Sequence, residues 1–242
     1  MFRLITCFLY MSGFLIYSMP QLARIKKLRH LPVKERDKIA HEYPKRFSKM
    51  FMKLTGSKVS VEGLDLIPDG PIVFIANHES DFDIPVLLGI IDKPFGFVSK
   101  IEVKKVPIIS SWLDAINCVL IDRKNRQQAL NSMQEAVKLL KEGHSLVIFP
   151  EGTRSKGGPV QPFKVGGIRL AQDAGVPIVP IAIKGTADVF EKNGRLIKPA
   201  HIKVTIGQHI DPKVYCHKEY KEIAEDVRQL IIAIRESWNI AS

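Results

Sequence analysis

Cysteine is scarce in this chain of 242 residues, which contains only Cys7, Cys118 and Cys216. An odd number of widely spaced cysteines fits neither a disulfide framework nor a zinc knuckle. We therefore expect a protein of the reducing cytoplasm. The chain also lacks internal repeats and low-complexity tracts, and 45% of its residues are hydrophobic, which is ample for a packed core.

Acidic residues are scarce between residues 21 and 60, where only Glu35, Asp37 and Glu42 occur. This stretch carries nine of the eleven net positive charges of the chain. A positive excess favours an anionic partner: nucleic acid, a phosphorylated substrate or a lipid surface. The stretch has no nucleic-acid-binding motif, and we expect no nucleic-acid partner. Its basic residues are Arg24, Lys26, Lys27, Arg29, Lys34, Arg36, Lys38, Lys45, Arg46, Lys49, Lys53 and Lys58.

A single apolar run, Leu4–Met19, precedes the basic stretch. As a helix it would extend about 24 Å, less than the roughly 30 Å of a bilayer's hydrocarbon core. No small-x-small cleavage site follows it, and Arg3 is the only basic residue before it. Both observations disfavour a signal peptide. We expect residues 1–57 to attach the protein to anionic lipids at the cytoplasmic face of the cell membrane, either as a short span or as a half-buried helix.

Residues 58–242 alternate strand-like with helix-like segments, which predicts one α/β domain with a central, largely parallel or mixed seven-stranded sheet covered by helices. The last two strands are expected to add an antiparallel edge. The predicted strands are Lys58–Glu62, Ile72–Ala76, Gly96–Ser99, Cys118–Ile121, Ser145–Phe149, Ile178–Lys184 and Ile202–Gly207. The predicted helices are Gln127–Lys141, Gly167–Asp173 and Lys218–Trp238.

His78 and Asp83 follow the buried strand Ile72–Ala76. A neutral imidazole accepts a proton near neutral pH, and a carboxylate on its other ring nitrogen fixes its tautomer. Residues five apart do not share a helix face, so the pair can meet only if His78 lies in a loop and Asp83 at a helix start. The alternative is that Asp83 or Ser80 caps the helix and His78 is an ordinary surface residue.

Other charged residues follow neighbouring predicted strands. Glu151, Gly152, Thr153 and Arg154 come after Ser145–Phe149, and an arginine there could bind a phosphate in bidentate fashion. Glu151 and Arg154 could instead pair with each other. Lys100 and Arg123 also follow strands and are expected at the same sheet edge as His78, although Asp122 and Arg123 could form a surface pair.

These segments together resemble the 1-acylglycerol-3-phosphate acyltransferases (lysophosphatidic acid acyltransferases) of the glycerolipid acyltransferase family. The resemblance covers residues 58–185, with four blocks in order. The first is the HX4D motif, Asn77 to Asp83. The second runs from Lys100 to Arg123, and the third is Phe149 to Ser155. Val179-Pro180-Ile181 is similar to the fourth, an apolar turn on the acyl-donor side.

The resemblance implies a membrane enzyme of phospholipid biosynthesis that acylates the sn-2 hydroxyl of lysophosphatidic acid to give phosphatidic acid. His78 would be the general base, oriented by Asp83. The phosphate would bind Arg123, Arg154 and Lys100, and the glycerol Glu151, Gly152 and Thr153. The acyl donor would be a thioester of acyl carrier protein or coenzyme A, with no metal and no other cofactor.

Several alternatives stay open. The acceptor could be glycerol 3-phosphate or another lysophospholipid, and the sequence leaves the donor, the acyl-chain length and the oligomeric state open. From other classes, the chain could be a non-enzymatic peripheral protein that binds anionic lipid, or a nucleic-acid binder whose affinity falls steeply with salt.

Overall fold

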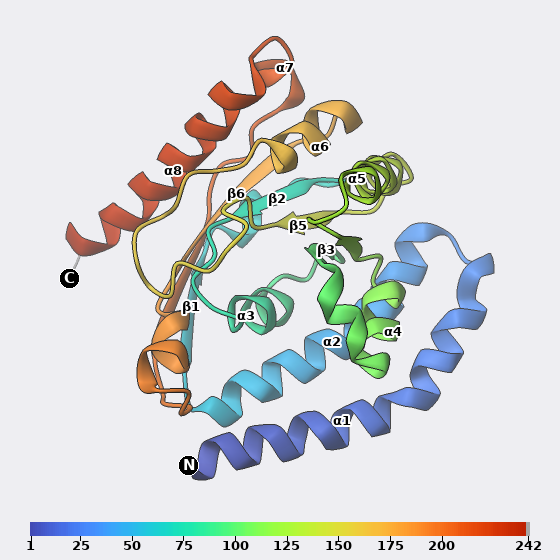
Figure 1. The fold of residues 1–242 in the computed structure, drawn as a ribbon, viewed down its shortest axis with the longest axis vertical. Helices are drawn as coiled ribbons and strands as arrows, with labels where there is room; N and C mark the ends of the chain where they lie inside the picture. Colours follow the sequence, from blue (N-terminus) through green and yellow to red (C-terminus); the bar gives the residue numbers. More distant parts are fainter. Residues whose placement is uncertain (241–242) are drawn as a thin grey trace.

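Seven strands form one mixed sheet in the computed structural model, which describes residues 1–240 (Figure 1). Their spatial order is β1-β7-β6-β2-β5-β3-β4. Every neighbouring pair is parallel except β6 and β7. The strands are β1 (Lys58–Glu62), β2 (Val73–Ala76), β3 (Gly96–Lys100), β4 (Val119–Ile121), β5 (Leu146–Ile148), β6 (Ile178–Lys184) and β7 (His201–Ile206).

The predicted seven-stranded mixed sheet is confirmed, with one correction at its edge. The last two strands do pair antiparallel, with Ile183 opposite Val204. However, β7 is not the edge strand, because β1 pairs with it in parallel on its outer side, with Val61 opposite Val204. The first strand of the chain therefore forms this edge of the sheet, and the last strand, β7, lies between β1 and β6.

Helices cover both faces of the sheet (Figure 1). On one face lie α3 (Asp83–Ile90) and α2 (Val33–Thr55), with α1 (Phe2–Lys26) and α4 (Pro107–Ala115) packed outside. On the other lie α5 (Arg126–Lys141), α6 (Gly166–Ala174) and α8 (Tyr220–Ile240). The short turns are α7 (Pro212–Tyr215) and the 3-10 segments Lys27–His30, Leu64–Leu66, Ile101–Lys105, Thr186–Val189 and Glu191–Asn193.

The central strand β2 shows why the sheet needs two helical layers. All four of its residues are buried. Phe74 and Ala76 pack into the core beneath α3, whereas Val73 and Ile75 pack into the core beneath α6 and α8. Side chains alternate across a strand, so a continuous apolar run is stable only where both faces are covered. This double burial fixes the end of β2, where the loop carrying His78 begins.

Helices α1 and α2 form a hairpin against this body (Figure 1). Tyr10 stacks on Phe47 with ring centroids 5.5 Å apart, and Phe14 contacts the same ring at 5.1 Å. Asp37 of α2 bonds to the body: its carboxylate pairs with the buried His144 and accepts a hydrogen bond from Asn117. Helix α1 therefore packs on α2, and α2 in turn is bonded to the α/β body.

The apolar run of the sequence is part of a longer helix than its sixteen residues indicate. Helix α1 has 25 residues, continues through Pro20, and is long and apolar enough to cross a membrane. Its outer side exposes large apolar residues, among them Phe8, Leu9, Ile16 and Tyr17, each more than half exposed. The division of the chain near residue 58 stays a prediction, although β1 does begin there.

Candidate active site

Four parallel strands, β2, β5, β3 and β4, end at the same edge of the sheet. The segments that follow them carry the polar residues that the sequence singled out. His78 comes after β2, Lys100 ends β3, Arg123 comes after β4, and the turn Pro150–Ser155 comes after β5. Ligand sites of α/β proteins typically occupy this carboxyl edge. The structure therefore brings together residues that are up to 76 positions apart in the sequence.

His78 and Asp83 are in direct contact. The Nδ1 atom of His78 lies 2.6 Å from Oδ2 of Asp83. His78 stands in the loop after β2, and α3 begins at Asp83, as the spacing of the pair requires. The His78 side chain is 16% exposed and that of Asp83 is fully buried. This geometry leaves Nε2 as the imidazole nitrogen that is not engaged by Asp83.

Asp83 is held by four hydrogen bonds. Its Oδ2 also accepts the backbone N–H groups of Glu79 at 2.8 Å and Ser80 at 3.0 Å, while Oδ1 accepts the hydroxyl of Thr186 at 2.5 Å. The carboxylate thus organises the turn before α3 and orients the His78 ring at the same time. Of the two alternatives that the sequence presented, the structure shows the contact with His78, whereas the N-terminus of α3 has no side-chain capping hydrogen bond.

The ring of His78 stacks on Phe149, with centroids 4.1 Å apart and an interplanar angle of 19°. Because the ring is fixed by Phe149 on its face and Asp83 at its edge, Nε2 has a defined direction. The side chain lines a cavity of about 220 Å³. Its lining residues are His78, Asp81, Ile84, Val98, Ser99, Lys100, Val103, Arg123, Phe149, Gly152, Thr153 and Arg154.

The three predicted cations line this cavity, but their partners differ from the sequence expectation. Arg123 donates to the carbonyl of Gly152, and Asp122 accepts from the Lys124 backbone rather than pairing with Arg123. Arg154 pairs with Asp81 and, at 3.4 Å, with Glu191, rather than with Glu151. Lys100 is exposed at the rim.

Glu151 has a different position from the one that a substrate ligand would need. It is 4% exposed and is absent from the cavity lining. Its Oε1 accepts the backbone N–H of His78 at 2.6 Å and its Oε2 that of Gln161 at 2.9 Å. Burial raises the pKa of this carboxyl, and these two hydrogen bonds oppose the shift. Glu151 therefore contacts the loop of His78 and not the cavity in which we expected it to bind glycerol.

Gly152, beside Glu151, has a backbone that few other residues could adopt. Its φ is 71°, and a Cβ atom there would lie 2.8 Å from Lys164 Nζ and 3.3 Å from Arg123 Nη1. Glycine therefore lets the turn bring its carbonyl to Arg123 while leaving room for both cations. Thr153, the next residue, is exposed and lines the cavity, in keeping with a contact to substrate.

The fourth block is placed differently from the expectation. Val179, Pro180 and Ile181 form no turn; they lie inside β6 and are buried. Val179 and Ile181 pack in the core beneath α3, and none of the three lines the cavity beside His78. An uninterrupted apolar run is typical of a central strand, which is the position that β6 occupies. Their role on the acyl-donor side stays a prediction.

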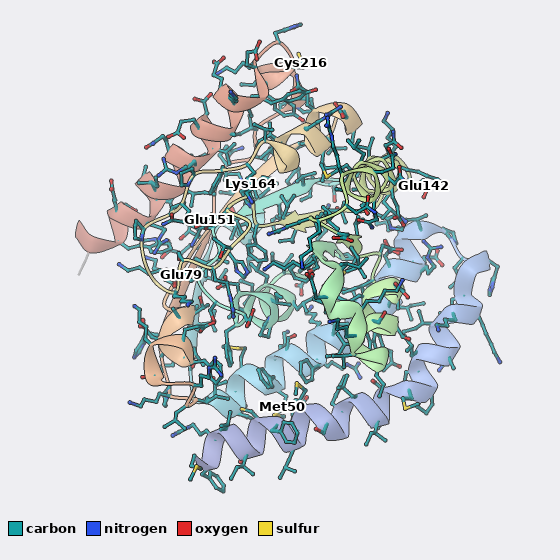
Figure 2. The ribbon with its side chains drawn as sticks, in the orientation of Figure 1. Met50, Glu79, Glu142, Glu151, Lys164 and Cys216 are labelled. Atoms are coloured by element: carbon teal, nitrogen blue, oxygen red, sulfur yellow. The ribbon has the colours of Figure 1, made fainter. Side chains whose placement is uncertain are left out.

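Several residues that support the site were missed by the sequence reasoning. Asn77 bonds the backbone of Ile183 through both its side-chain oxygen and its nitrogen, at 2.8 and 2.9 Å. Glu79 is buried and contacts Arg235 of α8 at 2.6 Å. Figure 2 places Glu79 and Glu151 close together at this end of the sheet. Glu79 lay within the quoted motif, whereas Arg235 carries no signal in the sequence, because only the tertiary fold brings α8 to the loop.

A second, apolar cavity of about 490 Å³ adjoins the first, with Asp81, Ile84 and Val103 lining both. It lies among α1, α2, α3 and α4. Its other lining residues are Met11, Phe14, Leu15, Pro44, Phe47, Ser48, Phe51, Phe82, Pro85, Leu88, Ile109, Trp112, Leu113 and Ile116. A cationic cavity beside an apolar one suits a molecule with a phosphate and an acyl chain.

Residues 58–184 match the sequence model of the family described as Acyltransferase. This chain belongs to that family. A protein named "Probable 1-acyl-sn-glycerol-3-phosphate acyltransferase" from Mycoplasma genitalium is 30% identical over 230 residues, or 90% of this acyltransferase and 85% of that protein. A chloroplast 1-acyl-sn-glycerol-3-phosphate acyltransferase from Arabidopsis thaliana is 32% identical over 76% of this chain, which spans about half (55%) of its length.

A crystal structure extends the similarity beyond the residues that match the family. The 1-acyl-sn-glycerophosphate (LPA) acyltransferase PlsC from Thermotoga maritima superposes with a TM-score of 0.83 at 27% identity, covering 98% of this acyltransferase and 95% of that chain. The likeness therefore includes the N-terminal helical hairpin and α8. Within residues 1–240, no group of three or more His, Cys, Asp or Glu side chains is placed to hold a metal ion. Independence from cofactors stays a prediction.

Proposed function

We propose that this acyltransferase transfers a fatty acyl group from a thioester to the sn-2 hydroxyl of 1-acylglycerol 3-phosphate, giving phosphatidic acid for phospholipid synthesis. The observation that carries the proposal is the His78–Asp83 contact at 2.6 Å, beside a cavity lined by Lys100, Arg123 and Arg154. Relatives named for this same reaction support it. An acceptor that carries both a phosphate and an acyl chain would use both adjoining cavities.

His78 acts as the general base in this proposal. Its Nε2 takes the proton from the acceptor hydroxyl while the hydroxyl oxygen attacks the thioester carbonyl carbon. The carbon–sulfur bond then breaks, and the thiolate takes the proton back from His78. Asp83 holds Nδ1–H and stabilises the transient imidazolium. The acyl group passes directly between the substrates, so no serine or cysteine of the protein is acylated.

The cations position the acceptor. Arg123 and Lys100 have no carboxylate partner among the ion pairs of residues 1–240, so their charges are available to a phosphate. Arg154 already pairs with Asp81 and Glu191, which hold its guanidinium at the cavity wall. Charge-assisted hydrogen bonds to phosphate fix the glycerol hydroxyl near Nε2. This positioning lowers the entropy cost of bringing the reacting groups together. Thr153 contributes a hydroxyl to the same wall.

We propose that the protein binds anionic lipids at the cytoplasmic face of the cell membrane. Helix α1 packs along α2 through Tyr10 and Phe14 while exposing Phe8, Leu9 and Ile16. This arrangement favours a helix that lies in the membrane interface with its outer side in lipid. Replacing Leu9 and Ile16 by serine should weaken sedimentation with anionic vesicles. Unchanged sedimentation would contradict this placement.

The acceptor and the donor are tested in one experiment. Purified protein is offered 1-acylglycerol 3-phosphate, glycerol 3-phosphate and other lysophospholipids, each with acyl carrier protein and coenzyme A thioesters, and the products are identified by mass. The proposal predicts phosphatidic acid as the main product. A main product from a different acceptor would replace the substrate assignment, and no product with any pair would favour a non-enzymatic lipid binder.

A further inference from the structure

Helix α8 places one half-buried cation, Arg235, against the loop that carries His78. Arg235 lies 156 positions after Glu79 and outside residues 58–184, which match the family. Its Nη2 donates to Glu79 Oε1 at 2.6 Å, and the two side chains are 14% and 2% exposed. Its Nη1 is buried and donates no hydrogen bond within the described part of the chain. Burying a guanidinium is costly unless it is paired, and Glu79 is the partner that the structure gives it.

Glu79 connects that cation to the dyad. It directly follows His78, and its backbone N–H donates to Asp83 Oδ2, the same oxygen that contacts His78 Nδ1. Its Oε2 accepts the backbone N–H of Gly185 at 2.8 Å. The residue is therefore fixed at its backbone by the dyad and at its side chain by α8 and the end of β6. A shift of its carboxylate would move the N–H that orients Asp83.

The charges around Glu79 show that Arg235 also acts on it electrostatically. Charged groups face Glu79 from three elements: Arg235 from α8, Asp83 from α3 and Lys192 from the 3-10 segment Glu191–Asn193. Burial raises the pKa of Glu79, nearby Asp83 raises it further, and Arg235 opposes both effects. Arg235 also lowers the pKa of Glu151, which burial raises. Glu151 is the other carboxyl that bonds the loop of His78.

We propose that Arg235 is a positioning residue for the acyl transfer, which holds the loop of His78 in its reactive geometry through Glu79. This inference rests on the proposed role of His78. It assigns to the C-terminal helix a function in the reaction step rather than in binding. The expected signature is a fall in kcat with little change in the KM values of acceptor and donor.

A double-mutant cycle tests this proposal. Arg235→Met removes the cation and leaves Glu79 buried without its partner, and we expect kcat to fall about 10- to 100-fold, because small misplacements in a site have effects of that size. Adding Glu79→Gln removes the stranded charge and keeps an acceptor for Gly185. The double variant should recover kcat to within about fivefold of Glu79→Gln. If Arg235→Met lowers kcat equally in the wild-type and the Glu79→Gln backgrounds, the two residues are not coupled and the proposal is wrong.

A matched control separates positioning from stability. Val227→Ala opens a cavity in the buried side of the same helix, since Val227 is fully buried. Both Arg235→Met and Val227→Ala should lower Tm, but at a temperature well below both Tm values only Arg235→Met should lose kcat. If the two variants lose activity in proportion to Tm alone, Arg235 has only a structural role and the proposal is wrong.

The pH dependence gives a further readout. Without Arg235, Glu79 becomes an unpaired buried anion as pH rises through its pKa, so the kcat of Arg235→Met relative to wild type should fall with rising pH. The same ratio in the Glu79→Gln background should stay flat. If Arg235→Met does not fold, the double variant decides: it should be folded and active, and an inactive double variant with native Tm would overturn the proposal.

Failure of this inference is distinguishable from failure of the proposed function. His78→Ala is assayed beside the cycle. If His78→Ala keeps wild-type activity, the general-base assignment fails whatever Arg235 does. If His78→Ala is inactive and Arg235→Met has wild-type kcat, only the role of Arg235 is refuted.

Discussion

The carboxylate of Glu151 accepts the backbone N–H of His78 at 2.6 Å, so the turn after β5 holds the loop after β2. Further bonds join the same two segments, because Ser155 and Lys156 donate to the carbonyls of His78 and Glu79 at 2.8 and 3.0 Å. The third sequence block thus lines the cavity and also holds the backbone of the first block. This relationship changes what a substitution of Glu151 should do.

Glu151→Gln should lower kcat at least about tenfold and change the KM of the acceptor less than about twofold. The glutamine has one carbonyl oxygen for two backbone N–H groups, so its NH2 group must face either His78 or Gln161. Steady-state kinetics check this split. A raised KM with unchanged kcat would instead support direct contact of Glu151 with glycerol. We expect that kinetic pattern of Thr153→Val.

Arg123→Ala should raise the KM of the phosphorylated acceptor roughly 10- to 100-fold and leave the KM of the donor nearly unchanged. A hydrogen bond to a charged group contributes about 1.5–3 kcal/mol. Lys100→Ala and Arg154→Ala should act in the same direction. Arg169→Ala is the control, because that arginine pairs with Asp173 on the surface of α6. A larger effect on the donor than on the acceptor would refute the phosphate role.

Ile109→Phe should shift the acyl-chain preference toward shorter chains. Ile109 lines the apolar cavity of about 490 Å³ beside the dyad, and a larger side chain there removes room for methylene groups. Competition between donors and acceptors of graded chain length, with products weighed by mass, measures the preference. An unchanged chain profile would indicate that the acyl chains lie elsewhere.

His41 should make the protein sensitive to acid. Its ring is buried edge-on against Phe95, and burial first and Lys45 second lower its pKa from 6.5 to about 4. The unfolded chain therefore binds more protons than the folded protein between these values, and the free energy of unfolding falls as pH drops through that window, by about 3 kcal/mol in total. Urea unfolding of wild type and His41→Leu at several pH values should show a smaller slope in the variant. Equal slopes would contradict it.

The sequence predicts the sheet and the dyad because both depend on local patterns. The apolar run before His78 indicates a strand buried on both faces, and the five-residue spacing places Asp83 at a helix start; α3 begins there. Such local rules predict α2 less well, because this helix continues through Pro44 although proline usually interrupts a helix interior.

The remaining site contacts depend on the tertiary fold. Glu151 bonds the loop and Arg154 pairs with Asp81 and Glu191, whereas the sequence left a Glu151–Arg154 pair open as an alternative. Thr186 and Arg235 reach the loop from segments more than 100 residues later. No periodicity or spacing encodes such contacts. The pairing of β1 with β7 is of the same kind, since it joins the first and the last strand of the chain.

The general-base role of His78 is tested most directly by one rate measurement. Formation of phosphatidic acid from 1-acylglycerol 3-phosphate and an acyl thioester is measured by mass for wild type and for His78→Ala, after both are shown to have the same fold. Removing a general base should lower kcat by about 10²- to 10⁴-fold. Wild-type turnover in His78→Ala would contradict the account.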